Sequence, residues 1–226
     1  MVELWWQEAR RHQVLPLDDR FRERVADPTR PLASQLRDVY RYFPGTSPVP
    51  NQALPLTLNC RHSFTARLVL NGADNQGFVV GQGSELSGWA LFVKDGHGVY
   101  VNNCVKLHFS EVRTAVALPV GREFSLGYEY EPVDIGFGNV RLLVDGQVVA
   151  IGERVPAAPM GYSNSIEGLQ VGRCWSTPIA YAHFQDSFPF TGRLLVVEMR
   201  SDPVSQLRRT NYADPGDEKP QPCAAK

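Results

Sequence analysis

The sequence predicts an all-β protein in which residues 49–200 form an antiparallel β-sandwich. Short runs of alternating apolar and polar residues recur between turn residues throughout this region, and this spacing is typical of a sandwich or barrel. Two of the runs, within residues 140–151, meet at Asp145-Gly146, and an Asp-Gly pair between β-prone runs predicts a hairpin with a type I′ turn. The composition agrees, because 19 glycines and 17 prolines indicate many turns and few long helices.

Bulk properties exclude several classes of protein. The 226 residues fit one large domain with extensions. A net charge of −1 provides no overall field that would attract nucleic acid or an anionic membrane, and no basic patch is interleaved with aromatic residues. No apolar run approaches the roughly 18 residues of a membrane span, and the charged start does not resemble a secretory signal. We therefore expect a cytoplasmic protein with neither a nucleic-acid partner nor a membrane partner.

The cysteines indicate neither a metal nor a redox motif. None of Cys60, Cys104, Cys174 and Cys223 forms a C-x-x-C pair, which excludes a zinc knuckle and a thioredoxin-like site. We expect three buried or half-buried free thiols and a fourth in the tail, although spacing alone leaves disulfides open. Free thiols fit a reducing cytosol.

Residues 1–48 are predicted to form a helix and an extended arm. Good helix formers fill residues 1–15, and Pro16 ends the helix. Trp5 and Trp6 lie about 100° apart on a helix, so one narrow apolar stripe cannot bury both. Either the helix folds back onto the sandwich or it packs on another domain. In the arm, a helical turn is expected at residues 18–25, and Tyr40 is among the residues that could anchor it.

Within the sandwich, the alternation and the turn residues predict strands at residues 53–59, 63–70, 77–82, 88–94, 98–103, 106–110, 114–117, 122–130, 140–144, 147–151, 169–172 and 192–200. Two longer connections, 156–164 and 174–189, are the usual places for a small helix or a ligand rim. The polar, proline-rich tail, residues 201–226, is expected to be disordered.

Few residues suggest chemistry. Asp18-Asp19 is a candidate acid–base or metal pair, but capping of the following turn is the simpler interpretation. Calcium on a sandwich needs clustered loop oxygens, and each candidate donor has an ordinary turn explanation; these are Asp74, Asp95, Asp134 and Asp186. Sugar binding needs exposed aromatic side chains, for which the candidates are Trp89, Tyr100, Trp175 and Tyr181. We predict that Trp89 lies in the core. Trp175, in a loop, is the better ligand-binding candidate, and the alternative is that it covers the core, which is the commoner role of a loop tryptophan.

Several motifs in order resemble the region that follows the catalytic domain in large bacterial arylsulfatases. They are Leu4-Trp5-Trp6-Gln7-Glu8-Ala9, Val14-Leu15-Pro16-Leu17-Asp18-Asp19-Arg20, Tyr42-Phe43-Pro44-Gly45-Thr46-Ser47-Pro48, Gly88-Trp89-Ala90-Leu91-Phe92-Val93-Lys94-Asp95-Gly96, Val144-Asp145-Gly146, Val171-Gly172-Arg173 and Pro189-Phe190-Thr191-Gly192. The later motifs also occur in many concanavalin A-like and laminin G-like sandwiches, so the expected fold is a jelly roll of that type.

The resemblance implies a module without the family's catalytic machinery. Arylsulfatase catalytic domains use formylglycine, made from a Cys or Ser, together with calcium; no cysteine here begins the modification motif, so we expect no cofactor and no catalytic residue. His62 matches a family position, whereas the two residues before it differ, and a structural histidine at a strand start is the simpler interpretation.

Two functions follow as hypotheses. In the first, the chain is a non-catalytic module that packs on a sulfatase catalytic domain, in cis or in trans. In the second, it is a free-standing glycan-binding, lectin-like module. The residues expected on the docking or ligand face are Trp5, Trp6, Arg20, His62 and Trp175.

Overall fold

The computed structural model describes residues 1–14, 37–46, 48–55, 57, 60–157 and 167–201. The chain divides into two compact units, and each is described by itself. One unit contains the helix α1 (Val2–Arg11), which confirms the expected N-terminal helix over these residues. No helix among the described residues is long and apolar enough to cross a membrane. The expected turn at residues 18–25, Arg20 and the tail beyond residue 201 lie outside the described residues.

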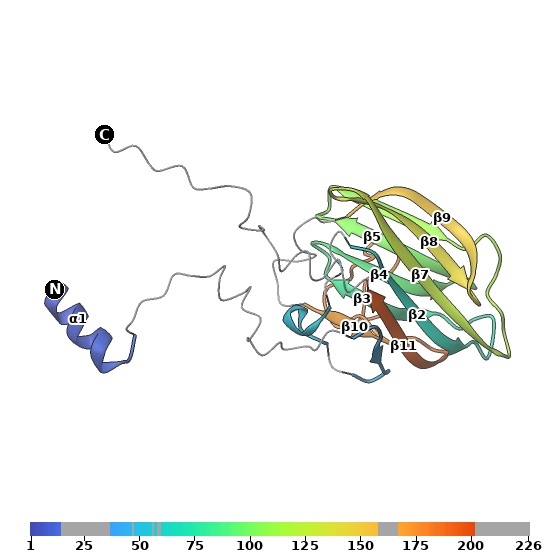
Figure 1. Ribbon diagram of the computed structural model, residues 1–226. Helices are drawn as coiled ribbons and strands as arrows, with labels where there is room; N and C mark the ends of the chain where they lie inside the picture. Colours follow the sequence, from blue (N-terminus) through green and yellow to red (C-terminus); the bar gives the residue numbers. More distant parts are fainter. Residues whose placement is uncertain (15–36, 47, 56, 58–59, 158–166, 202–226) are drawn as a thin grey trace. The chain divides into compact units, whose positions relative to one another are not determined.

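The second unit, residues 33–207, is an antiparallel sandwich, as predicted. Within the described residues, a six-stranded sheet has the order β1-β11-β2-β7-β8-β9 and a five-stranded sheet the order β10-β3-β4-β5-β6 (Figure 1). The strands are β1 (Tyr40–Tyr42), β2 (His62–Val69), β3 (Gly77–Gly83), β4 (Gly88–Lys94), β5 (His97–Cys104), β6 (His108–Arg113), β7 (Glu123–Asp134), β8 (Phe137–Val144), β9 (Gln147–Pro156), β10 (Leu169–Val171) and β11 (Arg193–Ser201).

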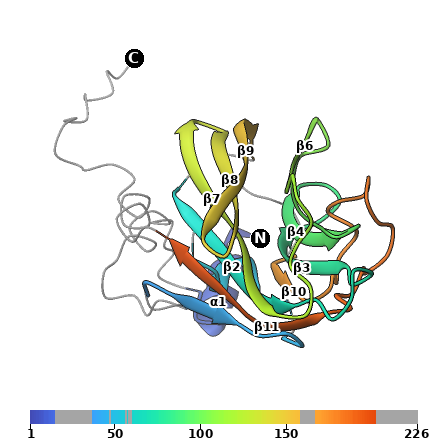
Figure 2. The same cartoon turned by 90° about the vertical axis from the view of Figure 1, so that its right-hand side faces the viewer.

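The two sheets face each other across an aromatic core, and Figure 2 shows them as two layers. Strand β2 alternates as the sequence predicts, with Phe64 buried and Arg67 exposed on opposite faces. The Phe64 ring lies 4.7 Å from the Trp89 ring of the opposite sheet, and Tyr128 lies 5.0 Å from the same ring. Trp89 is fully buried, which confirms its predicted place in the core.

The predicted Asp145-Gly146 hairpin is confirmed. It joins β8 and β9 at the edge of the six-stranded sheet, and φ is +49° at Asp145 and +77° at Gly146, as a type I′ turn requires. The Asp145 carboxylate accepts hydrogen bonds from the backbone N–H of Ser125 at 2.9 Å and from Arg122 Nη2 at 2.7 Å. These two bonds hold the pKa of Asp145 below its ordinary value, because they favour the charged form.

Three of the sequence predictions are corrected. The strand expected at residues 53–59 is absent from the described part of that segment, and a 3-10 turn occupies Asn51–Ala53 instead; prolines at positions 50 and 55 remove ladder donors there. Residues 114–117 form a connection after β6 rather than a strand. Conversely, part of the expected arm is strand β1, which pairs with β11, so the sandwich begins before residue 49.

The five-stranded sheet is buried on its outer face as well. A covering segment, residues 174–188, packs over β3, β4 and β5 and forms a second apolar cluster, and Figure 2 shows this orange chain outside those strands. In this cluster the Phe184 ring lies 5.6 Å from the Phe92 ring and 4.8 Å from the Phe188 ring. Every residue of β3 is therefore buried, which explains why these strands are nearly continuous apolar runs.

The described cysteines Cys60, Cys104 and Cys174 are free thiols, as expected, and Cys223 lies outside the described residues. Burial raises the pKa of the Cys104 and Cys174 thiols, because a thiolate is costly in an apolar environment.

His62 is an interior histidine and not a surface residue. It is 4% exposed, its Nδ1 lies 2.9 Å from the Cys60 carbonyl oxygen, and its ring stacks on Tyr130 with centroids 5.0 Å apart. Burial lowers the pKa of His62 from 6.5 to about 4. This location supports the structural interpretation over a place on a ligand face.

The buried histidine predicts a pH dependence of stability. As pH falls from 6.5 towards 4, the unfolded chain takes up a proton at His62 before the folded chain does, so stability is lost in that window by up to about 1.4 kcal/mol per pH unit. Urea unfolding at about pH 6.5 and about pH 5 should show this slope in the wild type and a flatter slope in H62Q. The exposed-site variant H108Q should keep the wild-type slope; an unchanged slope in H62Q would contradict the assignment.

Candidate functional site

The connection between β10 and β11 presents one exposed tryptophan on a fixed backbone. Trp175 is 51% exposed, although Cys174 just before it is buried in the second apolar cluster. Gly172 has φ +78°, a conformation that turns the chain sharply at the end of β10, and its N–H donates to the Val79 carbonyl oxygen at 2.9 Å. The backbone before Trp175 is thus bonded to the sheet while the indole faces solvent.

A buried glutamine holds the loop from beneath. Gln170, 1% exposed on β10, accepts hydrogen bonds at its Oε1 from the backbone N–H of Trp175 at 2.5 Å and of Ser176 at 3.1 Å. Its Nε2 donates to the Gly83 carbonyl oxygen at 2.9 Å. One side chain therefore ties the Trp175 loop to strand β3 and restricts the backbone that carries the indole.

Trp175 forms part of a surface hollow, here called the Trp175 pocket. Its volume is about 480 Å³, and its lining comes from the β1–β2 connection, from the end of β10 with the residues after it, and from the start of β11 with the residues before it. The lining residues are Pro44, Gly45, Val171, Gly172, Arg173, Trp175, Phe190, Gly192, Arg193 and Leu194. The volume lies within the range of small-molecule sites in proteins, about 300–1,000 Å³. The Arg173 guanidinium carbon lies 5.0 Å from the centroid of the Trp175 ring, a cation–π distance.

A second hollow, of about 570 Å³, lies on the outer face of the six-stranded sheet. Its charged side chains form ion pairs: Arg41 Nε lies 2.8 Å from Glu198 Oε1, and Arg67 Nη1 lies 3.2 Å from Glu123 Oε1. An arginine that is already paired with a carboxylate contributes little charge to ligand binding, so this hollow is the weaker candidate for a ligand site.

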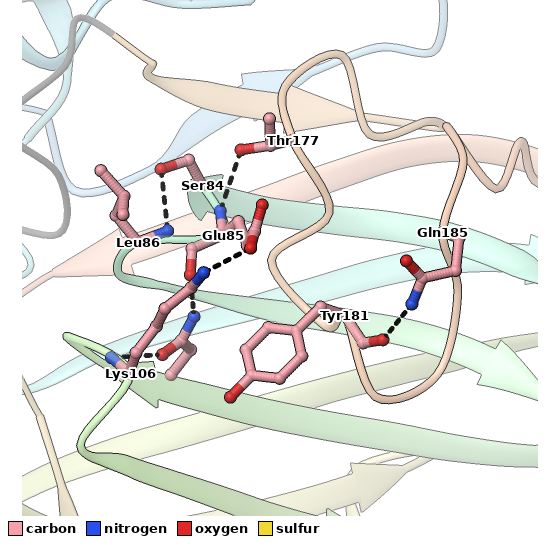
Figure 3. Close-up of polar contacts among 8 residues, drawn as sticks. Ser84, Glu85, Leu86, Lys106, Thr177, Tyr181 and Gln185 are labelled. Carbon is pink, nitrogen blue, oxygen red and sulfur yellow. Dashed lines mark hydrogen bonds and ion pairs between the residues drawn. The ribbon is translucent and has the colours of Figure 1, made fainter.

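Another aromatic side chain, Tyr181, lies in a polar contact network shown in Figure 3. Lys106 lies over the Tyr181 ring at 5.7 Å and forms an ion pair with Glu85. The Glu85 backbone N–H in turn donates to Thr177 Oγ1 at 3.2 Å. Tyr181 is half-buried between Lys106 and Phe109, whose ring lies 5.4 Å away. These contacts brace the covering segment against the β3–β4 and β5–β6 turns, which is a structural role.

The structure describes four of the five residues predicted for the docking or ligand face, and of these Trp175 alone lines the pocket. Trp175 lines the pocket, His62 lies in the sandwich interior, and Arg20 is outside the described residues. Trp5 and Trp6 belong to α1, in the other unit, where they are 47% and 38% exposed and contact each other edge to face at 4.7 Å.

Of the other sugar-binding candidates, Tyr100 is 1% exposed and packs in the core. Burial raises the pKa of its hydroxyl, since a phenolate is costly there.

The aspartates considered for calcium have turn roles. Asp134 Oδ1 accepts from the Ile135 N–H at 2.8 Å, Asp186 Oδ1 accepts from the Phe188 N–H at 2.8 Å, and Asp95 has a positive φ in the β4–β5 turn. Across the part of the chain that the structure describes, no three His, Cys, Asp or Glu side chains are grouped to hold a metal ion.

Sequence analysis missed Gln170 and Arg193. A signal for Arg193 was present, because Gly172-Arg173 and Gly192-Arg193 repeat a Gly-Arg pair at the two ends of the long connection. No sequence pattern indicated Gln170, because its hydrogen bonds to Trp175 and Ser176 form only when the loop folds over it.

Comparisons with known proteins find structural likeness only. No family model and no curated protein matches the chain, so nothing links it to sulfatases beyond the motif resemblance. Among solved structures, domains LG4-5 of the mouse laminin alpha1 chain match at 15% identity and a TM-score of 0.44, covering 72% of this chain and 41% of that one. The predicted antiparallel sandwich is confirmed by the sheet topology itself.

Two further matches come from bacteria. Domain 4 of AbnA, an extracellular arabinanase of Geobacillus stearothermophilus solved with arabinotriose, has 16% identity and a TM-score of 0.45, covering 69% of this chain and 68% of that one. A proposed carbohydrate-binding protein of Bacteroides ovatus has 16% identity and a TM-score of 0.46, covering 80% and 46%. This chain thus spans less than half the length of the laminin and Bacteroides chains.

The Gln170 anchor predicts how the Trp175 loop responds to mutation. Replacing Gln170 by Leu keeps the bulk but removes the bonds to the Trp175 and Ser176 N–H groups, so the exchange rates of these two amides should rise at least about tenfold. Hydrogen exchange followed by NMR measures this directly. The amides of β4 should keep their protection, as a control for global unfolding, and unchanged exchange at Trp175 would refute the anchoring role.

Proposed function

We propose that the sandwich binds a carbohydrate in the Trp175 pocket. The observation that supports this best is an exposed tryptophan on a backbone that Gln170 and Gly172 fix, at the edge of a hollow of sugar size. The C–H face of a pyranose ring is apolar and flat enough to pack on an indole, while its hydroxyls need polar groups at the rim. The Trp175 pocket provides both, since Arg173 and Arg193 line it beside the indole.

Pre-organisation adds to this argument. A ligand that orders a loose loop on binding loses affinity through the entropy of that ordering. The Trp175 loop is tied to the sheet by buried bonds before any ligand arrives, so little ordering remains. Two of the similar structures come from proteins described by carbohydrate binding; the likeness is of fold alone, and the proposal depends on the pocket.

Glycan-array binding tests the proposal. The purified chain should bind members of the array, and W175A should bind them at least about tenfold more weakly, because the stacking surface is lost. W175A should unfold at nearly the wild-type denaturant concentration, since its side chain is half exposed. The variant W5A removes an exposed tryptophan from the other unit and should bind as the wild type does. Absence of binding to any glycan, or full binding by W175A, would refute the proposal.

A second candidate function is docking on a sulfatase catalytic domain, which the exposed pair Trp5 and Trp6 on α1 favours. Large aromatic side chains this open to solvent are typical of surfaces that another protein covers.

The docking candidate has its own test. The chain alone, with calcium and an aryl sulfate, should show no turnover, and it should co-sediment with a bacterial arylsulfatase catalytic domain. The double variant W5A/W6A should lose this association, whereas W175A should keep it. Turnover by the chain alone, or association unaffected by W5A/W6A, would remove this candidate.

A further inference from the structure

The Trp175 pocket has an uncompensated positive charge. Arg173 and Arg193 both line it, and none of the described residues in the lining is acidic. Within the described residues, neither guanidinium forms an ion pair. Burial raises the pKa of the Cys174 thiol, and the charge of Glu167 makes a smaller contribution in the same direction. Glu167 itself does not line the pocket.

Elsewhere on the sandwich, arginines next to strands are paired with carboxylates. The pairs are Arg41–Glu198, Arg61–Glu131, Arg67–Glu123, Arg122–Asp145, Arg141–Glu129, Arg141–Glu131 and Arg154–Asp134. Against this background, two arginines without a carboxylate partner in the pocket of one exposed indole indicate that the pocket can bind a negatively charged group of another molecule. Two other arginines of the strands, Arg113 on β6 and Arg200 on β11, form no ion pair within the described residues either. Arg113 Nη2 donates to the Lys94 carbonyl oxygen at 3.5 Å, and neither arginine lines the Trp175 pocket.

The two arginines are held close to each other by the backbone. Arg173 follows Gly172, whose carbonyl oxygen accepts a hydrogen bond from the Phe190 N–H at 2.9 Å. Arg193 begins β11 three residues after Phe190. Arg173 is also positioned over the Trp175 ring, which restricts its side chain. A guanidinium fixed in this way presents its planar set of donors at little entropic cost, and that geometry matches carboxylate and sulfate oxygens.

We propose that the ligand of the Trp175 pocket is an acidic oligosaccharide, in which one sugar ring stacks on Trp175 while its carboxylate or sulfate group binds Arg173 and Arg193. This inference rests on the proposed carbohydrate-binding function and names its ligand class. A neutral sugar would leave both charges unpaired, whereas an acidic sugar uses the stacking surface and the charges together. Binding should therefore weaken as ionic strength rises, because both arginines are exposed.

A glycan array of matched pairs tests the ligand class. Each pair presents one oligosaccharide with and without its carboxylate, or with and without a sulfate ester, so the two arms also distinguish the two acidic groups. The members that the wild-type chain binds should be acidic, and each neutral counterpart should bind at least about tenfold more weakly. Equal binding of neutral counterparts would overturn this inference and leave the carbohydrate-binding proposal standing; no binding to any member would overturn both.

Variants then assign the charge recognition to the two arginines. R193Q should weaken binding of the acidic members about tenfold, and R173K, which keeps the charge but loses the planar set of donors, should weaken it as well. The matched control R200Q changes an exposed arginine of the same strand, roughly 23 Å along the chain from Arg193, and should bind as the wild type does. Isothermal titration at low and high salt should show a salt dependence that R193Q reduces. An unchanged affinity in both R193Q and R173K would overturn the inference.

Discussion

The five-stranded sheet must be covered on both of its faces, and the rest of the structure depends on this constraint. Its inner face packs against the six-stranded sheet through Trp89, and its outer face carries Phe78 and Phe92, which are fully buried. Because exposed apolar surface of this size is unfavourable in water, a second layer is required. Residues 174–188 of the same chain form this second layer by packing over the outside of β3, β4 and β5.

The same segment creates the candidate site. Buried anchors at Cys174 and Phe184 keep it on the sheet, and Lys106 with Glu85 braces its far side against two turns (Figure 3). Trp175 sits where the segment leaves β10, directly after an anchored residue, so its indole turns outward. One piece of backbone thus covers the sheet and positions the exposed tryptophan that is the candidate ligand-binding side chain.

Several features followed from local sequence. Alternation in β2 predicted which side chains face the core, and the Asp145-Gly146 pair predicted its hairpin. The interior place of His62 also agreed with the simpler interpretation of a lone histidine at a strand start. The errors arose where tertiary context overrides local pattern. Residues 53–59 are apolar enough for a strand, but Pro55 interrupts them and the described part of the range is not a strand. The short strand β1 forms because β11 offers it an open edge.

By itself, the sequence determined the fold class and most strand positions, because side-chain alternation and turn chemistry act over a few residues. Only the tertiary structure decided that Arg173, Trp175 and Arg193 share one pocket and that Gln170 supports it. Arg193 comes from a segment separate from residues 170–175, and the two segments are joined by the hydrogen bond from the Phe190 N–H to the Gly172 carbonyl oxygen. Proximity across the fold depends on which surfaces must be buried together, and no local pattern in the chain encodes that.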